Sequence, residues 1–239
     1  MSSRIVRVLA VVVGASAVAL AAPQSVDELV ARNIEAKGGL ARLREVRTIK
    51  QVSRMRTADG MEATQTTFLK RPNLMRQEVS FGGQLVINAF DGVTPWIINP
   101  FAGPPRPIAI SGPQADAIRE QADFDGRLVD YHAKGYAIAL AGAETMDGRR
   151  VHHLRITAPS KQLSHLYLDA ATGLEVKETT AVDQAKLEQQ FSDYRTVDGL
   201  TVPFLIRLLT NGVVQSEIRV QSVEFNVQVD DAIFRMPKG

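Results

Sequence analysis

Cysteine is absent from all 239 residues of this chain. A disulfide framework, a thiol nucleophile and a thiolate metal site are therefore excluded. No cysteine follows the N-terminal apolar segment to accept a lipid, so we expect a product without a lipid anchor. Metal chemistry has little support, because two of the four histidines, His152 and His153, are neighbours in a predicted strand and point to opposite faces. We expect no metal site.

Motifs of known catalytic machinery are also missing. The sequence has no H-E-x-x-H, no G-x-S-x-G, no P-loop and no G-x-G-x-x-G. Ser164 and His165 are adjacent but show no triad pattern, so an exported hydrolase is only a second alternative. That alternative predicts that activity is lost when Ser164 or His165 is substituted.

Long apolar runs are confined to the N-terminus. Arg4 and Arg7 precede a short apolar stretch that ends in Ala19-Leu20-Ala21, a small-x-small cleavage site. These features predict a signal peptide over residues 1–21 and a single mature domain over residues 22–239, which is exported and released. Removal of the two arginines leaves 26 acidic residues balanced by the remaining basic ones, so no nucleic-acid partner is expected.

The rest of the chain reads as β structure with two helices. Ser25 and Glu28 have capping-box spacing, which predicts a helix over residues 26–37. Sequential strand-like runs follow, punctuated by glycine and proline, and residues 113–123 predict a weakly apolar helix. We predict a mainly β (α+β) fold: a half-open antiparallel β-barrel of about 10–11 strands, with an N-terminal helix and a helical lid over a hydrophobic cavity.

The stretch from Phe90 to Pro100 is central to this interpretation. Asp91-Gly92 predicts a tight turn before Trp96, the only tryptophan. Trp96 has two readings, either as an ordinary core residue or as part of the wall of an apolar cavity. Strand alternation selects candidates for the wall of the ligand-binding cavity, and the predicted helix adds Ile118 beneath the lid. The wall candidates are Phe68, Phe81, Trp96, Ile98, Phe204 and Ile206.

In its order of features the mature chain resembles the LolA/LolB/LppX-type superfamily, in particular the outer-membrane lipoprotein-sorting proteins. The features are the N-terminal helix, the D-G-x-x-x-W-x-x-x-P stretch at Asp91–Pro100, the mid-chain helix, the turn at 167–174, the strand around Phe191-Ser192-Asp193-Tyr194 and the closing segment with Asp231, Phe234 and Pro237. The resemblance implies a lid over a hydrophobic cavity, no enzymatic activity and no cofactor.

The resemblance also implies partners. They are an acylated lipoprotein or a lipid as cargo, membrane-anchored donor or acceptor proteins, and transient contact with a membrane. Family carriers can use a buried arginine to hold the closed lid, and the candidates by sequence are Arg54, Arg56, Arg76 and Arg155. We therefore expect a periplasmic carrier of acyl chains. A regulatory protein of the same fold that senses a lipid or peptide is the first alternative.

Overall fold

The chain folds around one antiparallel sheet. In the computed structural model, which describes residues 25–238, thirteen strands follow the order β6-β5-β4-β3-β2-β1-β13-β12-β11-β10-β9-β8-β7. The chain forms two meanders, β1 to β6 and β7 to β13. They join at the centre of the sheet, where β1 pairs with β13. The predicted signal peptide, residues 1–21, lies outside the described residues.

The helices and strands have the following bounds: α1 (Val26–Ala36), α2 (Leu40–Glu45), β1 (Thr48–Thr57), β2 (Glu62–Lys70), β3 (Leu74–Phe81), β4 (Gln84–Phe90), β5 (Pro95–Ile98), β6 (Ile108–Ala109), α3 (Gly112–Gln121), β7 (Ala137–Met146), β8 (Arg149–Thr157), β9 (Leu163–Asp169), β10 (Glu175–Val182), β11 (Ala185–Val197), β12 (Leu200–Thr210), β13 (Val213–Phe225) and the 3-10 helix η1 (Asp231–Phe234).

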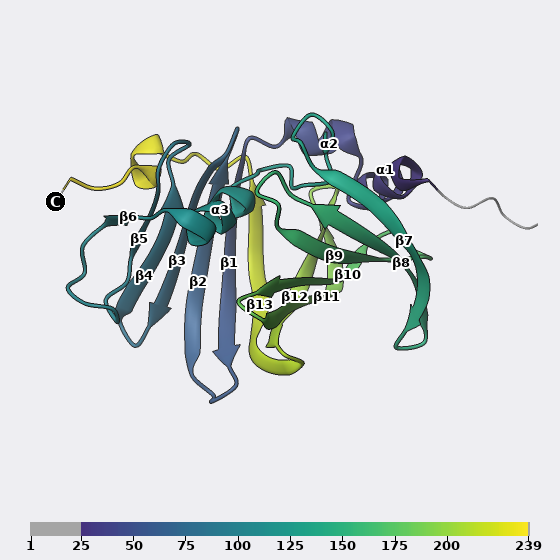
Figure 1. Cartoon of the computed structure of the whole chain (residues 1–239). Helices are drawn as coiled ribbons and strands as arrows, with labels where there is room; N and C mark the ends of the chain where they lie inside the picture. Colours follow the sequence, from purple (N-terminus) through teal and green to yellow (C-terminus); the bar gives the residue numbers. More distant parts are fainter. Residues whose placement is uncertain (1–24, 239) are drawn as a thin grey trace, which may run out of the picture.

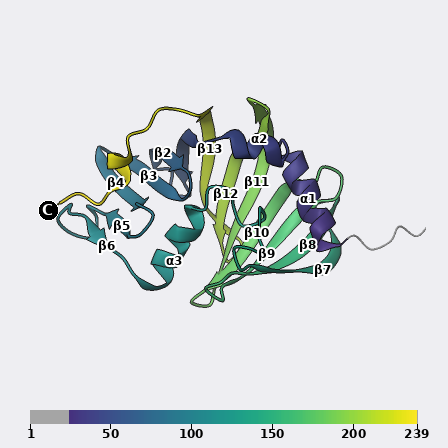
Figure 2. The same ribbon diagram turned by 90° about the horizontal axis from the view of Figure 1, so that it is seen from above.

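The sheet is strongly curved but does not close. Figure 1 shows α1 and α2 along one rim, and Figure 2 shows the strands bending around a concave side that α3 crosses. The predicted mainly β fold, a half-open antiparallel barrel, is confirmed. The described strands number thirteen rather than ten or eleven. One of those added is β6, only two residues long, which lies within a segment predicted to be a loop because of its prolines.

Helix α1 forms where the capping box predicted it. The Ser25 side chain accepts a hydrogen bond from the Glu28 amide, and the Glu28 carboxylate accepts one from the Ser25 amide. Leu29 and Val30 then pack against the concave face of β8 and β9 and against Leu128. The helix is thereby fixed against one half of the sheet.

Helix α3 is held to the other half by few apolar contacts. Ile118 and Ala122 pack on Met75 of β3 and Phe90 of β4. On its other flank, the Glu120 carboxylate accepts a hydrogen bond from Ser160 in the β8–β9 turn. The helix therefore bridges the two halves across the open side of the barrel. No helix within residues 25–238 is long and apolar enough to span a membrane.

The C-terminal segment covers the convex face. Trp96 is fully buried there with Ile87, Ala89 and Ile98, and its indole Nε1 donates a hydrogen bond of 2.8 Å to the Phe234 carbonyl of η1. The Arg76 guanidinium, on the same face, lies over the indole ring and donates to the Ile233 carbonyl. The tryptophan thus anchors the end of the chain to β5.

Replacement of Trp96 by alanine should lower the free energy of unfolding by about 3–5 kcal/mol, because a large fully buried aromatic side chain leaves a cavity. Urea unfolding followed by circular dichroism measures this change. Replacement of the exposed Val93 by alanine serves as the control and should change stability by less than about 0.5 kcal/mol. Equal stability of the two variants would contradict the anchoring role.

Candidate functional site

The seven residues proposed from the sequence divide between the two faces of the sheet. Side chains at directly paired positions of neighbouring strands lie on the same face, so the register assigns a face to each residue. The face that packs against Ile118 of α3 is the concave one. The face covered by the C-terminal segment is the convex one.

Three of the seven residues lie on the convex face. Trp96 and Ile98 belong to the cluster that includes Met236. Phe68 pairs with Arg76, whose guanidinium contacts η1. These three positions correct the prediction that all seven residues share one cavity wall. Strand alternation sorts the residues of a strand between two faces, but it does not say which face is concave. Whether any of the seven residues contacts a ligand stays a prediction.

The other four residues lie on the concave side. Ile118 packs beneath α3, and Phe81 shares the face of Met75 and packs edge-on against Phe101. Phe204 clusters with Val220, and Ile206 pairs with Ile218. Phe204 and Ile206 therefore lie together near the centre of the sheet, whereas Ile118 packs against β3 and β4.

The apolar surface at the centre of the concave face is a continuous row. Direct pairing runs across five adjacent strands, from β11 to β2, through Phe191, Ile206, Ile218, Met55 and Ala63. At about 4.8 Å between strands, the row spans about 19 Å. We call these five residues the apolar row.

A second row on the same face is polar. Gln51, Thr67, Gln77 and Asn88 occupy directly paired positions on β1, β2, β3 and β4. All four are half-buried. The concave face is therefore mixed rather than uniformly hydrophobic, because the alternation of each strand fixes the side of a residue but not its chemistry.

The segment after α3 crosses the concave side and is fixed by charged groups. We call residues 123–136 the strap. The Arg71 guanidinium donates to both oxygens of Asp125 at 2.6 Å, and it also donates to the carbonyls of Leu43 and Val46. Burial alone would raise the pKa of Asp125, but the hydrogen bond and the charge of Arg71 lower it overall.

Further side chains tie the strap to the helices. The Tyr131 hydroxyl donates to Asp27 of α1 at 2.6 Å, and Arg44 of α2 pairs with Asp130. Within the strap, the Lys134 ammonium contacts both oxygens of Asp123. The strap thus connects α1, α2 and the β2–β3 turn without forming regular secondary structure.

The arginine that joins the strap to the sheet is Arg127. Its guanidinium pairs with Glu178 of β10 and donates to the Ser164 hydroxyl of β9. Burial would lower the pKa of Arg127, but the charge of Glu178 raises it overall. Sequence reasoning considered arginines on strands and missed this one, because the irregular segment after α3 gave no periodic signal that would place it against the sheet.

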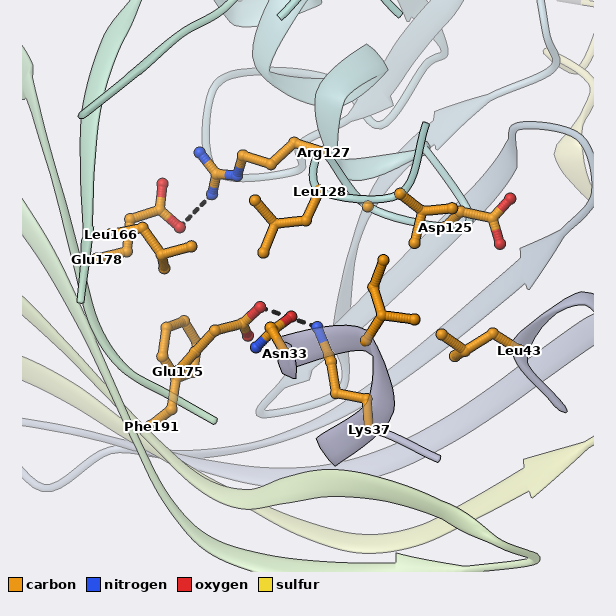
Figure 3. A pocket seen from close by; sticks show the side chains of 13 residues that line it. Asn33, Lys37, Leu43, Asp125, Arg127, Leu128, Leu166, Glu175, Glu178 and Phe191 are labelled. Carbon is orange, nitrogen blue, oxygen red and sulfur yellow. Dashed lines mark hydrogen bonds and ion pairs between the residues drawn. The ribbon is translucent and has the colours of Figure 1, made fainter. Parts of the chain in front are cut away.

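A cavity of about 240 Å³ lies between α1, the strap and strands β9 to β11 (Figure 3). Its walls carry the Arg127–Glu178 pair and the Lys37–Glu175 pair, together with apolar side chains such as Leu166. Phe191, the first residue of the apolar row, also lines it. The cavity therefore has both charged and apolar side chains in its walls, and it adjoins the apolar row at Phe191.

A larger and more open groove of about 490 Å³ runs along the outer flank of α3. Asp116, Arg119 and Glu120 of α3 line one side, and Pro159 and Ser160 of the β8–β9 turn line the other. The groove separates α3 from the β8–β9 turn. The hydrogen bond from Ser160 to Glu120 crosses it.

Ser164 and His165 do not form a nucleophile and base. Ser164 receives the hydrogen bond from Arg127 on the concave side, whereas the His165 ring contacts the His153 ring at 2.7 Å between nitrogens. His153 and His165 share the face of Tyr167, which pairs with Lys177. Adjacent residues of a strand point to opposite faces, so this pair gives no support to the hydrolase alternative.

Asp125→Asn should lower the free energy of unfolding at pH 7 by about 2 kcal/mol, because it leaves the partly buried Arg71 without its counter-charge. Since the folded-state pKa of Asp125 is lowered, its contribution is present above the unfolded pKa of about 3.9 and is lost as pH falls through the folded pKa. Urea unfolding between pH 7 and pH 3 should show the difference from the native chain shrinking in acid.

Asp116→Asn is the matched control for this measurement. Asp116 makes an exposed ion pair with Arg119 within α3, so its loss should change stability by less than about 0.5 kcal/mol. A difference for Asp125→Asn that stayed constant with pH would show that its charge does not hold the strap.

Comparison with known proteins places the fold. No protein-family model matches this sequence, and no curated protein does. Among solved structures, a LolA superfamily protein from Nitrosomonas europaea aligns with TM-score 0.61 and 14% identity, over 89% of this chain and 98% of that one. A DUF1329 family protein from Desulfovibrio piger gives 0.60 and 14%, over 88% and 97%.

A putative outer membrane lipoprotein-sorting protein domain from Vibrio parahaemolyticus also aligns, with TM-score 0.56 and 13% identity, over 87% of this chain and 95% of that domain. All three alignments cover 87–89% of this chain. The chain therefore has the fold of the LolA superfamily.

Proposed function

We propose that this protein is a periplasmic carrier that binds the acyl chains of lipids or lipoproteins and moves them between membranes. The observation that supports it best is the apolar row, an apolar path about 19 Å long on the concave side of an open sheet. A lipid tail gains about 0.8 kcal/mol for each methylene that leaves water. Proteins with this fold include one described as an outer membrane lipoprotein-sorting domain.

A carrier must also release its cargo, and α3 suits that requirement. Its apolar contact with the sheet depends on Ile118, Ala115 and Ala122, and Ala residues bury little area. The strap next to it is held by several ion pairs, and these fix its position. We infer that α3 moves as the lid while the strap stays in place, so the opening faces the β8–β9 turn.

Contact with a membrane is favoured by the rim opposite α1 and α2. Large exposed apolar side chains gather at the hairpin ends on this rim, at Met61, Leu85, Leu163, Val182, Leu187, Val213 and Val214. They come from five separate turns, so they form an arc rather than one flat patch. A fluid lipid surface can adapt to such an arc, which is why we propose this rim for transient docking.

Ile206→Asn should weaken binding of a fluorescent fatty acid about tenfold, which corresponds to about two lost methylene contacts. Fluorescence titration of the mature protein measures this affinity. Leu205→Asn is the matched control, because Leu205 is also half-buried but points to the convex face opposite Arg219. Equal loss in both variants, or no binding by the native chain, would count against the carrier.

The double substitution Val213→Asp and Val214→Asp should reduce binding to lipid vesicles at least fivefold. The reason is that charged side chains at the β12–β13 turn resist entry into the interfacial region of the bilayer. Vesicle co-sedimentation measures the bound fraction. Val93→Asp is the control, since Val93 is 80% exposed but lies in the β4–β5 turn at the other rim. A larger effect from Val93→Asp would place the docking surface elsewhere.

A further inference from the structure

The cavity behind the strap contains an unsatisfied hydrogen-bond acceptor. Asn33 of α1 is 1% exposed, and its Nδ2 donates to the Gly173 carbonyl at 2.9 Å, which fixes the amide. Within residues 25–238, its Oδ1 is the only buried side-chain nitrogen or oxygen without a hydrogen-bond partner. Buried polar atoms in native proteins normally have a partner. A hydrogen-bond donor, from a water molecule or from a ligand, is therefore expected next to this atom.

The charged residues around Asn33 add acceptors of the same kind. Figure 3 shows Asn33 beside the Lys37–Glu175 pair, with the Glu178 carboxylate across the cavity. Lys37 contacts Oε1 of Glu175, and Arg127 contacts Oε2 of Glu178. The second oxygen of each carboxylate has no hydrogen bond to another described residue. Asn33, Glu175 and Glu178 thus all line the same cavity.

The position of α1 favours a positive charge in the same place. Asn33, Ile34 and Lys37 line the cavity with the last turn of the helix. The C-terminal end of a helix carries the negative end of its dipole and stabilises cations. Two carboxylates and a helix C-terminus together suit a compact ammonium, which donates three hydrogen bonds. Lys37 and Arg127 suit an anionic group next to it.

The cavity also has apolar side chains in its walls, and at one of them it adjoins the proposed path for the acyl chain. Leu128, Leu166 and Phe191 line the cavity, and Phe191 pairs with Ile206 in the apolar row. A ligand with a charged head in the cavity can therefore extend its chain along the sheet. Such a ligand is an amphiphile rather than a free metabolite.

We propose that the cavity binds the head group of the cargo, and that this head carries a primary ammonium beside an anionic group. The proposal rests on the proposed function, because the chain of the same molecule occupies the apolar row. The Asn33, Glu175 and Glu178 oxygens accept from the ammonium, and Lys37 and Arg127 face the anion. The strap holds this end in place while α3 opens over the chain.

The test compares three lipids that share the same two acyl chains and differ only in the head. The probes are a phosphatidylethanolamine, the corresponding phosphatidylcholine, whose nitrogen carries three methyl groups and no N–H, and a phosphatidylglycerol. Competition titration and native mass spectrometry of the native chain should show phosphatidylethanolamine bound at least tenfold more tightly than either of the others. Equal affinities, or tighter binding of another head, would overturn the proposal.

Failure of this inference can be told apart from failure of the proposed function. Binding of all three lipids with equal affinity rejects the ammonium site and leaves the carrier standing. Binding of none of them rejects both. Because this comparison uses the native chain, it does not depend on the folding of any variant.

Glu175→Gln tests the site from the protein side. It keeps the shape of the side chain but removes a negative charge, so the preference for phosphatidylethanolamine should fall below threefold while binding of phosphatidylcholine is retained. Glu217→Gln is the matched control, because Glu217 is a half-buried carboxylate that pairs with Arg207 and Arg219 on the convex face. An unchanged preference in Glu175→Gln, or its loss in Glu217→Gln, would overturn the assignment.

Discussion

The bidentate pair between Arg71 and Asp125 holds together parts of the molecule that no strand pairing connects. Arg71 lies in the β2–β3 turn, Asp125 lies in the strap, and the same guanidinium donates to the carbonyls of Leu43 and Val46 at the end of α2. A planar guanidinium with five N–H donors can make these contacts at once, whereas an ammonium cannot. Without this pair, the strap would lose its contact with the β2–β3 turn, and its remaining polar contacts would be those to α1, α2, β9 and β10.

The strap in turn divides the concave side into regions of different chemistry. Behind it lies a small charged cavity with Asn33, and beyond that lies the apolar row from Phe191 to Ala63. In front of it, α3 rests on the other half of the sheet through Ile118 and two alanines. The strap thus places a cavity with charged groups beside the apolar row, which suits the amphiphile that we propose as cargo.

Several features of the chain could be predicted because their causes are local. The α1 capping box depends on Ser25 and Glu28 only, and helix α3 begins near Pro113 as its sequence indicated. The mainly β character follows from alternation and turn residues along each strand. The site was less predictable. Trp96 and Phe68 have the alternation of inward residues, yet the C-terminal segment covers their face, and a contact so distant in sequence leaves no local pattern.

The sequence by itself determined the class of fold, the two helices that flank the sheet and the absence of cysteine chemistry. Only the tertiary structure decided which face of each strand is concave. Strand periodicity sorts side chains between two faces, but it does not say which of them faces the inside of the barrel. It also decided that Arg127 meets Glu178 and that Asn33 keeps a free acceptor, since these groups come from α1, the strap and β10. Their chemistry depends on burial and on partners brought together by the curvature of the sheet.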